Sequence, residues 1–174
     1  MGYAVNTATT RALFNYAGFQ GGWFLLVLTR SPWALVWVAV FMLCHYRWLA
    51  QPGEWHRVIP VMMIGAMIDL LWHLSPWVEF IGAGWPMPLW LTGLWLMFPL
   101  TLNHSLAWLA NRPLLQILGG VFGAGGSYLG GAALGAAEVS GPAWWLIPLG
   151  WGLWLPLFYR CNRTLALKAT TASS

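Results

Sequence analysis

The sequence predicts an all-α membrane protein, a polytopic bundle of six transmembrane helices with both termini in the cytoplasm. Of its 174 residues, 59% are hydrophobic and 7% are charged, whereas about a quarter of the residues in a soluble domain carry a charge. The 15 tryptophans support the same class, because an indole ring with one N–H suits the boundary between lipid tails and headgroups. Six apolar runs are each long enough to cross a bilayer, so residues 1–174 are expected to form one integral membrane domain.

The first three spans are predicted over residues 12–29, 33–50 and 58–75. A Ser31-Pro32 turn separates the first two spans, and the polar loop 51–57 separates the second from the third. No small-x-small cleavage site follows the first run, so we expect it to stay in the protein as a span. Residues 76–87 are too broken by Pro and Gly to cross and are expected to lie in the membrane interface. A re-entrant element is the alternative there.

The last three spans are predicted over residues 88–110, 114–137 and 143–159. A polar turn, Asn111-Arg112-Pro113, joins the first two of these, and residues 138–142 precede the last. The span 114–137 has glycine at positions 119, 120, 123, 125, 126, 130, 131 and 135. The pairs 119/123, 126/130 and 131/135 have the spacing that lets a neighbouring helix backbone come close. This span is therefore expected inside the bundle.

The basic residues predict the orientation. Six spans place both termini on one side, and seven of the eight Lys and Arg residues fall on that side: Arg11, Arg47, Arg57, Arg112, Arg160, Arg163 and Lys168. Arg30 falls on the other side. Cytoplasmic loops are enriched in Lys and Arg, so both termini are expected in the cytoplasm. The same distribution accounts for the net charge of +4 without a nucleic-acid partner.

Asp69 is the main candidate functional residue, because it lies roughly 16 Å along the predicted span 58–75 at about 1.5 Å per residue. A carboxylate near the middle of a bilayer costs about 3 kcal/mol and marks a functional site by default. His73 follows one helical turn later on the same face, so an Asp–His pair is available. The alternative is a structural role, in which Asp69 joins two helices by hydrogen bonds.

A second set of polar residues is expected in the cytoplasmic half of the bundle. Span 88–110 carries three of them in a row, Asn103, His104 and Ser105. Asn15 of the first span and His45 of the second are expected at a similar depth. The sequence therefore predicts one polar cluster in which Asp69 is the residue deepest in the membrane. Tyr128 could donate a hydrogen bond to this cluster. The candidate catalytic residues are Asp69, His73 and His104. The candidate binding residues are Asn15, His45, Asn103, Ser105 and Tyr128.

No metal site is predicted, and the cofactor stays open. The four histidines show neither HxxH nor HxxxH spacing, and the two cysteines form no C-x-x-C pair. His45 and His104 could serve as axial ligands of a haem, which is the less favoured alternative. No Walker loop, nucleophile elbow or dinucleotide fingerprint occurs. Tryptophans expected deep in the bundle, Trp37, Trp72, Trp95 and Trp151, are interpreted as packing residues, with a groove for an acyl or isoprenoid chain as the alternative.

Several segments carry a family resemblance. They are residues 88–90 (PLW), 95–98 (WLMF), 101–108 (TLNHSLAW), the glycine-rich 119–136, and the earlier Asn15, Gln20, Trp23 and 65–69. Together they cover nearly the whole chain, which resembles an uncharacterised bacterial inner-membrane family, domain of unknown function twenty-eight seventy-eight. The resemblance implies a location in the bacterial inner (cytoplasmic) membrane. Genes of that family accompany those for lipid-modifying enzymes of the cyclopropane-fatty-acid-synthase type, which implies a lipid-linked role.

These observations lead to three functional hypotheses. The first is an accessory or binding protein for a lipid or isoprenoid-like molecule, with membrane lipid and an enzyme of lipid metabolism as its partners. The second is an intramembrane acid–base enzyme of the isomerase or cyclase type that uses Asp69 with a histidine. The third is a small proton-coupled transporter in which Asp69 relays the proton. The polar residues of the two halves do not correspond, which disfavours an inverted-repeat transporter.

Overall fold

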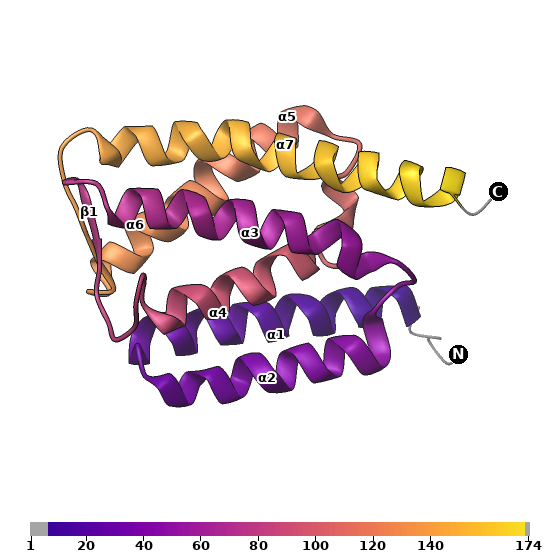
Figure 1. Ribbon diagram of the computed structural model, residues 1–174, viewed down its shortest axis with the longest axis horizontal. Helices are drawn as coiled ribbons and strands as arrows, with labels where there is room; N and C mark the ends of the chain where they lie inside the picture. Colours follow the sequence, from indigo (N-terminus) through magenta and orange to yellow (C-terminus); the bar gives the residue numbers. More distant parts are fainter. Residues whose placement is uncertain (1–6, 173–174) are drawn as a thin grey trace, which may run out of the picture.

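Helices make up most of the computed structural model, which describes residues 7–172 and the side chains of residues 7–167. Figure 1 shows the long helices running side by side, with a short sheet across one end. The side chain of Lys168, counted above among the cytoplasmic cations, lies outside the described part. The helical fold class is confirmed. The number of membrane-crossing helices and the side on which the termini lie stay predictions.

The first half of the chain forms α1 (Thr7–Thr29), α2 (Leu35–Cys44) and α3 (Glu54–His73), close to the first three predicted spans. A short 3-10 turn, η1 (Pro32–Ala34), leads into α2, and the π-helical turn η2 (His45–Leu49) continues it. α3 begins earlier than residue 58, because Glu54 accepts a hydrogen bond from the Gln51 N–H at 3.1 Å. An acidic side chain also favours the N-terminus of a helix.

The second half departs from the predicted spans. α4 (Leu89–Met97) and the 3-10 turn η3 (Phe98–Thr101) form only the first part of the span 88–110, and η4 (Ala107–Leu109) follows a stretch of turns. Pro99 removes one backbone donor at this point, and the polar side chains that follow bond to other segments. The span 114–137 is built from α5 (Pro113–Leu118), the π-helical η5 (Gly119–Ala124) and α6 (Gly125–Ala133). α7 (Ala143–Ala172) continues well past residue 159.

The segment 76–87 contains a strand that the sequence analysis did not predict. β1 (Val78–Phe80) pairs antiparallel with β2 (Ala137–Val139), and Glu79 lies opposite Glu138. In β1 the two apolar side chains are buried and Glu79 is exposed, which is the alternation of a half-buried strand. The sheet closes the end of the bundle that lies opposite the start of α1 and the end of α7 (Figure 1).

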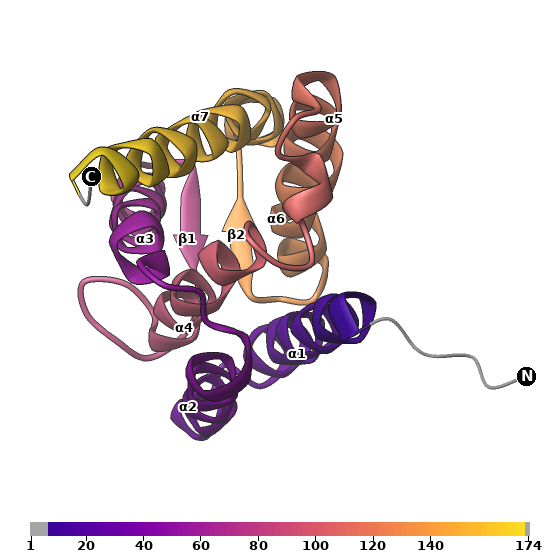
Figure 2. The same cartoon turned by 90° about the vertical axis from the view of Figure 1, so that its right-hand side faces the viewer.

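Seen along the helices, α7, α3, α4, α1 and then α5 with α6 follow one another around the bundle (Figure 2). α2 packs outside this ring against α1 and α4. α7 packs against η5 and the start of α6, where Gly120 and Gly125 have no side chains to keep the two backbones apart. An added Cβ at Gly120 would clash with the Trp151 carbonyl, and one at Gly125 would lie 2.6 Å from Pro148 Cα.

Among the described residues, one helix is long and apolar enough to cross a membrane by length and composition, α3. Its 20 residues extend about 30 Å, the thickness of a bilayer's hydrocarbon core. Large apolar side chains are also exposed on the outer faces of the long helices, such as Leu13, Leu43, Met63 and Leu153. Extensive exposed apolar surface marks a protein or membrane contact. Both findings favour a membrane protein.

Candidate functional site

A cavity of about 750 Å³ lies between α1, α4, the segment from α5 to α6, and α7. Its walls are mostly aromatic and aliphatic, and they include Phe19 and Trp23 of α1 and Leu155 of α7. Gly123 and Gly131 also line it, and a Cβ added at either would meet no atom within 4 Å. These glycines leave open space beside the helix. The predicted close helix contacts lie instead at Gly120 and Gly125, on the side of the helix that faces α7.

Asp69 lies in the wall of this cavity, with 1% of its surface exposed. One carboxylate oxygen accepts a hydrogen bond from Trp95 Nε1 of α4 at 2.7 Å, and the other accepts one from the Tyr128 hydroxyl of α6. Trp95 and Tyr128 line the cavity as well. The Trp95 ring is held in place by stacking on Trp151 with ring centroids 5.8 Å apart. Two donors to a buried carboxylate offset part of the cost of removing it from water.

His73 does not join Asp69 in the described part of the chain. Its Nδ1 accepts a hydrogen bond from the Phe80 N–H at 3.2 Å, and its ring packs on the Phe80 ring. The side chain therefore ties the end of α3 to β1. The predicted Asp69–His73 pair does not form: Asp69 pairs with Trp95 and Tyr128, and His73 is engaged with Phe80.

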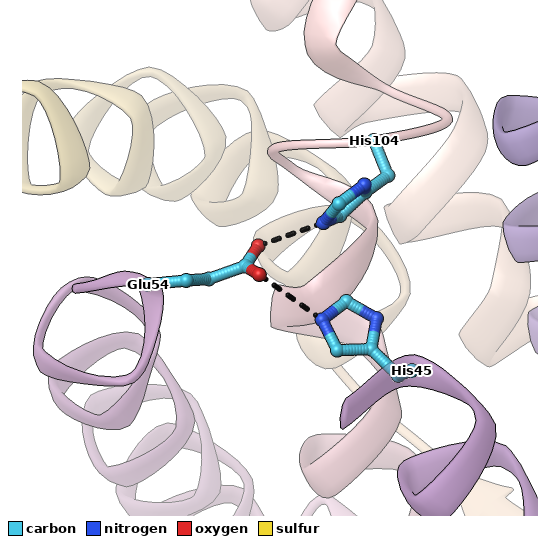
Figure 3. A group of neighbouring side chains, drawn as sticks. All are labelled: His45, Glu54 and His104. Carbon is cyan, nitrogen blue, oxygen red and sulfur yellow. Dashed lines mark hydrogen bonds and ion pairs between the residues drawn. The ribbon is translucent and has the colours of Figure 1, made fainter. Parts of the chain in front are cut away.

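His104 lies in a second polar site, at the other end of α3 (Figure 3). Its Nε2 is 2.9 Å from Glu54 Oε1, and His45 Nε2 is 3.1 Å from Glu54 Oε2. Between positions 54 and 69 the helix rises about 22 Å at about 1.5 Å per residue, so His104 and Asp69 belong to separate sites. The two imidazole rings have centroids 4.8 Å apart and are perpendicular. Both rings point at one carboxylate, an arrangement that does not suit a haem held between them.

The remaining predicted binding residues stabilise the interrupted part of the chain after η3. Asn15, fully buried in α1, accepts hydrogen bonds from the Ser105 N–H at 3.3 Å and the Ser105 hydroxyl at 2.6 Å. Asn103 Oδ1 accepts one from Asn162 of α7 at 2.6 Å. Asn15 also donates to the Leu100 carbonyl at 3.4 Å. Backbone groups that leave a helix inside a bundle need such partners, so these contacts have a structural role.

Sequence reasoning missed three residues of these sites. Glu54 was placed in a polar loop, although an acidic residue directly before an apolar run has the position expected at a helix N-terminus. Trp95 was interpreted as a packing residue, although a buried indole N–H needs an acceptor. Nothing in the sequence pointed to Asn162, since its partner lies far away along the chain.

Comparisons with known proteins bear on the family alone. The model of a family described as a protein of unknown function (DUF2878) matches residues 12–157, most of the chain. This is the family that the motifs of the sequence resemble. Curated proteins and solved structures gave no match.

Proposed function

The chain belongs to the family described as a protein of unknown function (DUF2878), and we propose that it is a multi-pass protein of the bacterial inner membrane that binds one lipid or isoprenoid-like molecule. In this proposal it acts as an accessory to an enzyme of lipid metabolism. The observation that carries the proposal is the cavity of about 750 Å³ beside Asp69. Sites for small molecules are typically about 300–1,000 Å³, with apolar walls and a few polar groups.

The polar groups of the cavity favour a neutral ligand. None of its described lining residues is Lys or Arg, and Asp69 is the single acidic one among them. A phosphate buried there would lack a positive partner and would be repelled by an ionised Asp69. Trp95 and Tyr128 each donate one hydrogen bond to Asp69, and each carboxylate oxygen can accept a second one, so Asp69 can still accept a hydrogen bond from a ligand. The best ligand is a long apolar molecule with a hydroxyl group, such as an isoprenoid alcohol or a neutral acylglycerol.

We infer that the cavity opens on the outer face of the bundle between α1 and η5, because two of its lining side chains there are exposed. Of the residues lining it, Phe24 of α1 is 51% exposed and Phe122 of η5 is 74% exposed. Two apolar side chains at an opening admit an apolar molecule more readily than water. In a bilayer this opening would face lipid tails, so the ligand could enter sideways from the membrane.

The proposed orientation follows from the arrangement of charged residues. α1 begins and α7 ends at the same end of the molecule (Figure 1), and Arg57 lies in the first turn of α3 at that end. The sheet at the opposite end carries Glu79 and Glu138. Because positive residues are retained on the cytoplasmic side, the end with the termini would face the cytoplasm.

An intramembrane enzyme is the second candidate function. The hydrogen-bonded pair of Asp69 and Tyr128 lies in the cavity wall, where it could move a proton to or from a bound apolar substrate. The pair replaces the Asp–His combination expected from the sequence. Proton-coupled transport has less support, since a relay needs several titratable groups in line. Asp69 is the single Asp, Glu or His among the described cavity residues.

The test is to fill the cavity and measure bound lipid. In Gly131→Leu the new side chain would occupy the open space, whereas Gly126→Leu places the same side chain on the same helix at a position that does not line the cavity. Lipids extracted from detergent-purified protein are compared by mass spectrometry. We expect wild type and Gly126→Leu to carry one enriched neutral lipid and Gly131→Leu to lose it. Wild-type protein carrying only bulk phospholipid would exclude the proposal.

A separate measurement distinguishes binding from catalysis. Membranes of cells with wild type, Asp69→Asn or no protein are compared for total lipid composition. An accessory protein that loses its ligand on replacement of Asp69 should lower its partner's product only in part, because the partner enzyme is still present, whereas an enzyme should lose one product completely. Complete loss of a product with normal expression of Asp69→Asn would favour the enzyme.

A further inference from the structure

The second polar site, formed by His45, Glu54 and His104, has the composition of a metal centre. The three residues come from η2, the start of α3 and the turn after η3, and Figure 3 shows both imidazole rings directing Nε2 at the Glu54 carboxylate. Their possible ligand atoms all lie within 4.8 Å of one another. The side chains of His45 and Glu54 are fully buried, and that of His104 is 7% exposed.

We propose that His45, Glu54 and His104 bind a divalent transition-metal ion of the Zn²⁺ or Fe²⁺ class. Two imidazole nitrogens and one carboxylate are the donor set of catalytic zinc sites and of non-haem iron sites, both of which keep further positions open for water or substrate. The proposal does not depend on the lipid cavity: Asp69, the acidic residue of that cavity, lies about 22 Å from Glu54 along α3 at the rise of an α-helix, although the cavity wall extends to Leu106 near His104.

The distances fit such an ion after a small adjustment. An ion about 2.1 Å from each ligand atom requires these atoms to lie within about 4.2 Å of one another. The two His–Glu distances, 2.9 and 3.1 Å, satisfy this condition. The largest separation is at most 4.8 Å, little above this limit, so a small rotation of one imidazole ring would close the site.

The backbone around each ligand permits that rotation. His45 begins a π-helical turn, a distortion often found at functional sites. His104 lies in the turns between η3 and η4, where no regular helix constrains it. Glu54 is the first residue of α3 and is oriented by the Gln51 N–H.

The surroundings of His45 are also compatible with metal binding. His45 Nδ1 is buried and has no hydrogen-bond partner among the described residues, so a rotation of the ring breaks no hydrogen bond at this nitrogen. The aromatic rings of Phe41 and Trp55 pack around His45. They lower the local dielectric and strengthen the attraction between an ion and the carboxylate.

The experiment uses the full chain with an affinity tag that contains no histidine. Purified protein is stripped with EDTA, loaded with ZnSO₄ and desalted, and its zinc is counted by elemental mass spectrometry. A Zn²⁺ titration in competition with a chromogenic chelator gives the affinity. Loading with Co²⁺ instead gives a visible absorption band whose form reports nitrogen and oxygen ligands. The variants are Glu54→Gln and His104→Gln, and the control is His56→Gln, an exposed histidine in the first turn of the same helix.

We expect one zinc ion per chain in wild type and in His56→Gln. Glu54→Gln and His104→Gln should bind zinc at least about 100-fold more weakly, because loss of an outer-shell partner alone costs 10–100-fold, and they should lose the Co²⁺ band. His104→Gln keeps Glu54 paired with His45, so it provides a folded variant even where Glu54→Gln does not fold. Wild-type protein that is helical by circular dichroism but retains no zinc, or variants that retain it fully, would overturn the proposal.

Discussion

Asp69 and Glu54 are two buried carboxylates on one helix, and they differ in the partners that keep them buried. Asp69 accepts hydrogen bonds from a tryptophan and a tyrosine and faces an open cavity. Glu54 lies between two histidines and accepts a backbone N–H. Neutral donors leave Asp69 available to a ligand in the cavity. The imidazole partners of Glu54 are themselves metal ligands, so these three side chains could bind the proposed ion in place of their mutual hydrogen bonds. The two ends of α3 therefore suit different chemistry.

The largest expected effect comes from removing the carboxylate between the histidines. Glu54→Ala leaves two buried imidazoles without their hydrogen-bond partner, and each buried polar group left without a partner costs about 1–3 kcal/mol. Thermal unfolding of the protein in detergent, followed by circular dichroism, measures this loss. The control is Glu79→Ala, since Glu79 is exposed on β1. A loss no greater than that of the control would show that the cluster does not stabilise the fold.

Asp69→Asn should destabilise the protein less than Glu54→Ala does, but it should reduce the amount of bound lipid more. The amide keeps the shape of the side chain but supplies one acceptor oxygen in place of two, so either Trp95 or Tyr128 loses its acceptor, at a cost of about 1–3 kcal/mol. We expect the co-purified lipid to fall to the background level. Tyr128→Phe, which removes one donor and keeps the carboxylate, should cost about 1 kcal/mol. Full retention of lipid by Asp69→Asn would exclude Asp69 as the polar contact of the ligand.

Glycines near the Asp69 cavity are of two kinds: Gly120 is packed against α7, whereas Gly123 faces open space. Replacing each one tests where the open space lies. Gly120→Ala should destabilise the protein by about 1–3 kcal/mol, because its methyl group would enter the backbone of α7. Gly123→Ala has no atom to meet, and replacing a helical glycine by alanine stabilises by roughly 0.5–1 kcal/mol. Unfolding in detergent compares the two. Equal destabilisation by both would mean that no cavity exists beside Gly123.

The smallest effect is expected from His73, which belongs to neither site. His73→Phe removes the acceptor of the Phe80 N–H and should cost about 1 kcal/mol, with lipid and zinc content unchanged. Lipid extraction and zinc analysis of the purified variant measure both contents. A loss of lipid as large as that of Asp69→Asn would restore the pairing of these two residues that the sequence predicted.

The sequence predicted the positions of single helices well. It predicted poorly where helices break and which segments pair with one another. The apolar runs located α1, α2 and α3, because length and hydropathy are local properties. The run 88–110 predicted one span, whereas α4 ends at Met97 and its 3-10 continuation ends at Thr101. Apolar residues continue through this break, so hydropathy alone could not reveal it. β1 was missed for a similar reason, since three residues become a strand only when a second segment pairs with them.

By itself, the sequence determined an apolar, largely helical chain, its family, and the presence of a carboxylate that must find partners inside the bundle. Only the tertiary structure decided which partners these are. Trp95 and Tyr128 lie 26 and 59 positions from Asp69, and His104 lies 50 positions from Glu54. Such pairs depend on the rotation and relative height of packed helices, which many side chains set together. A polar residue's position in its own span predicts its depth but not the neighbour that it meets.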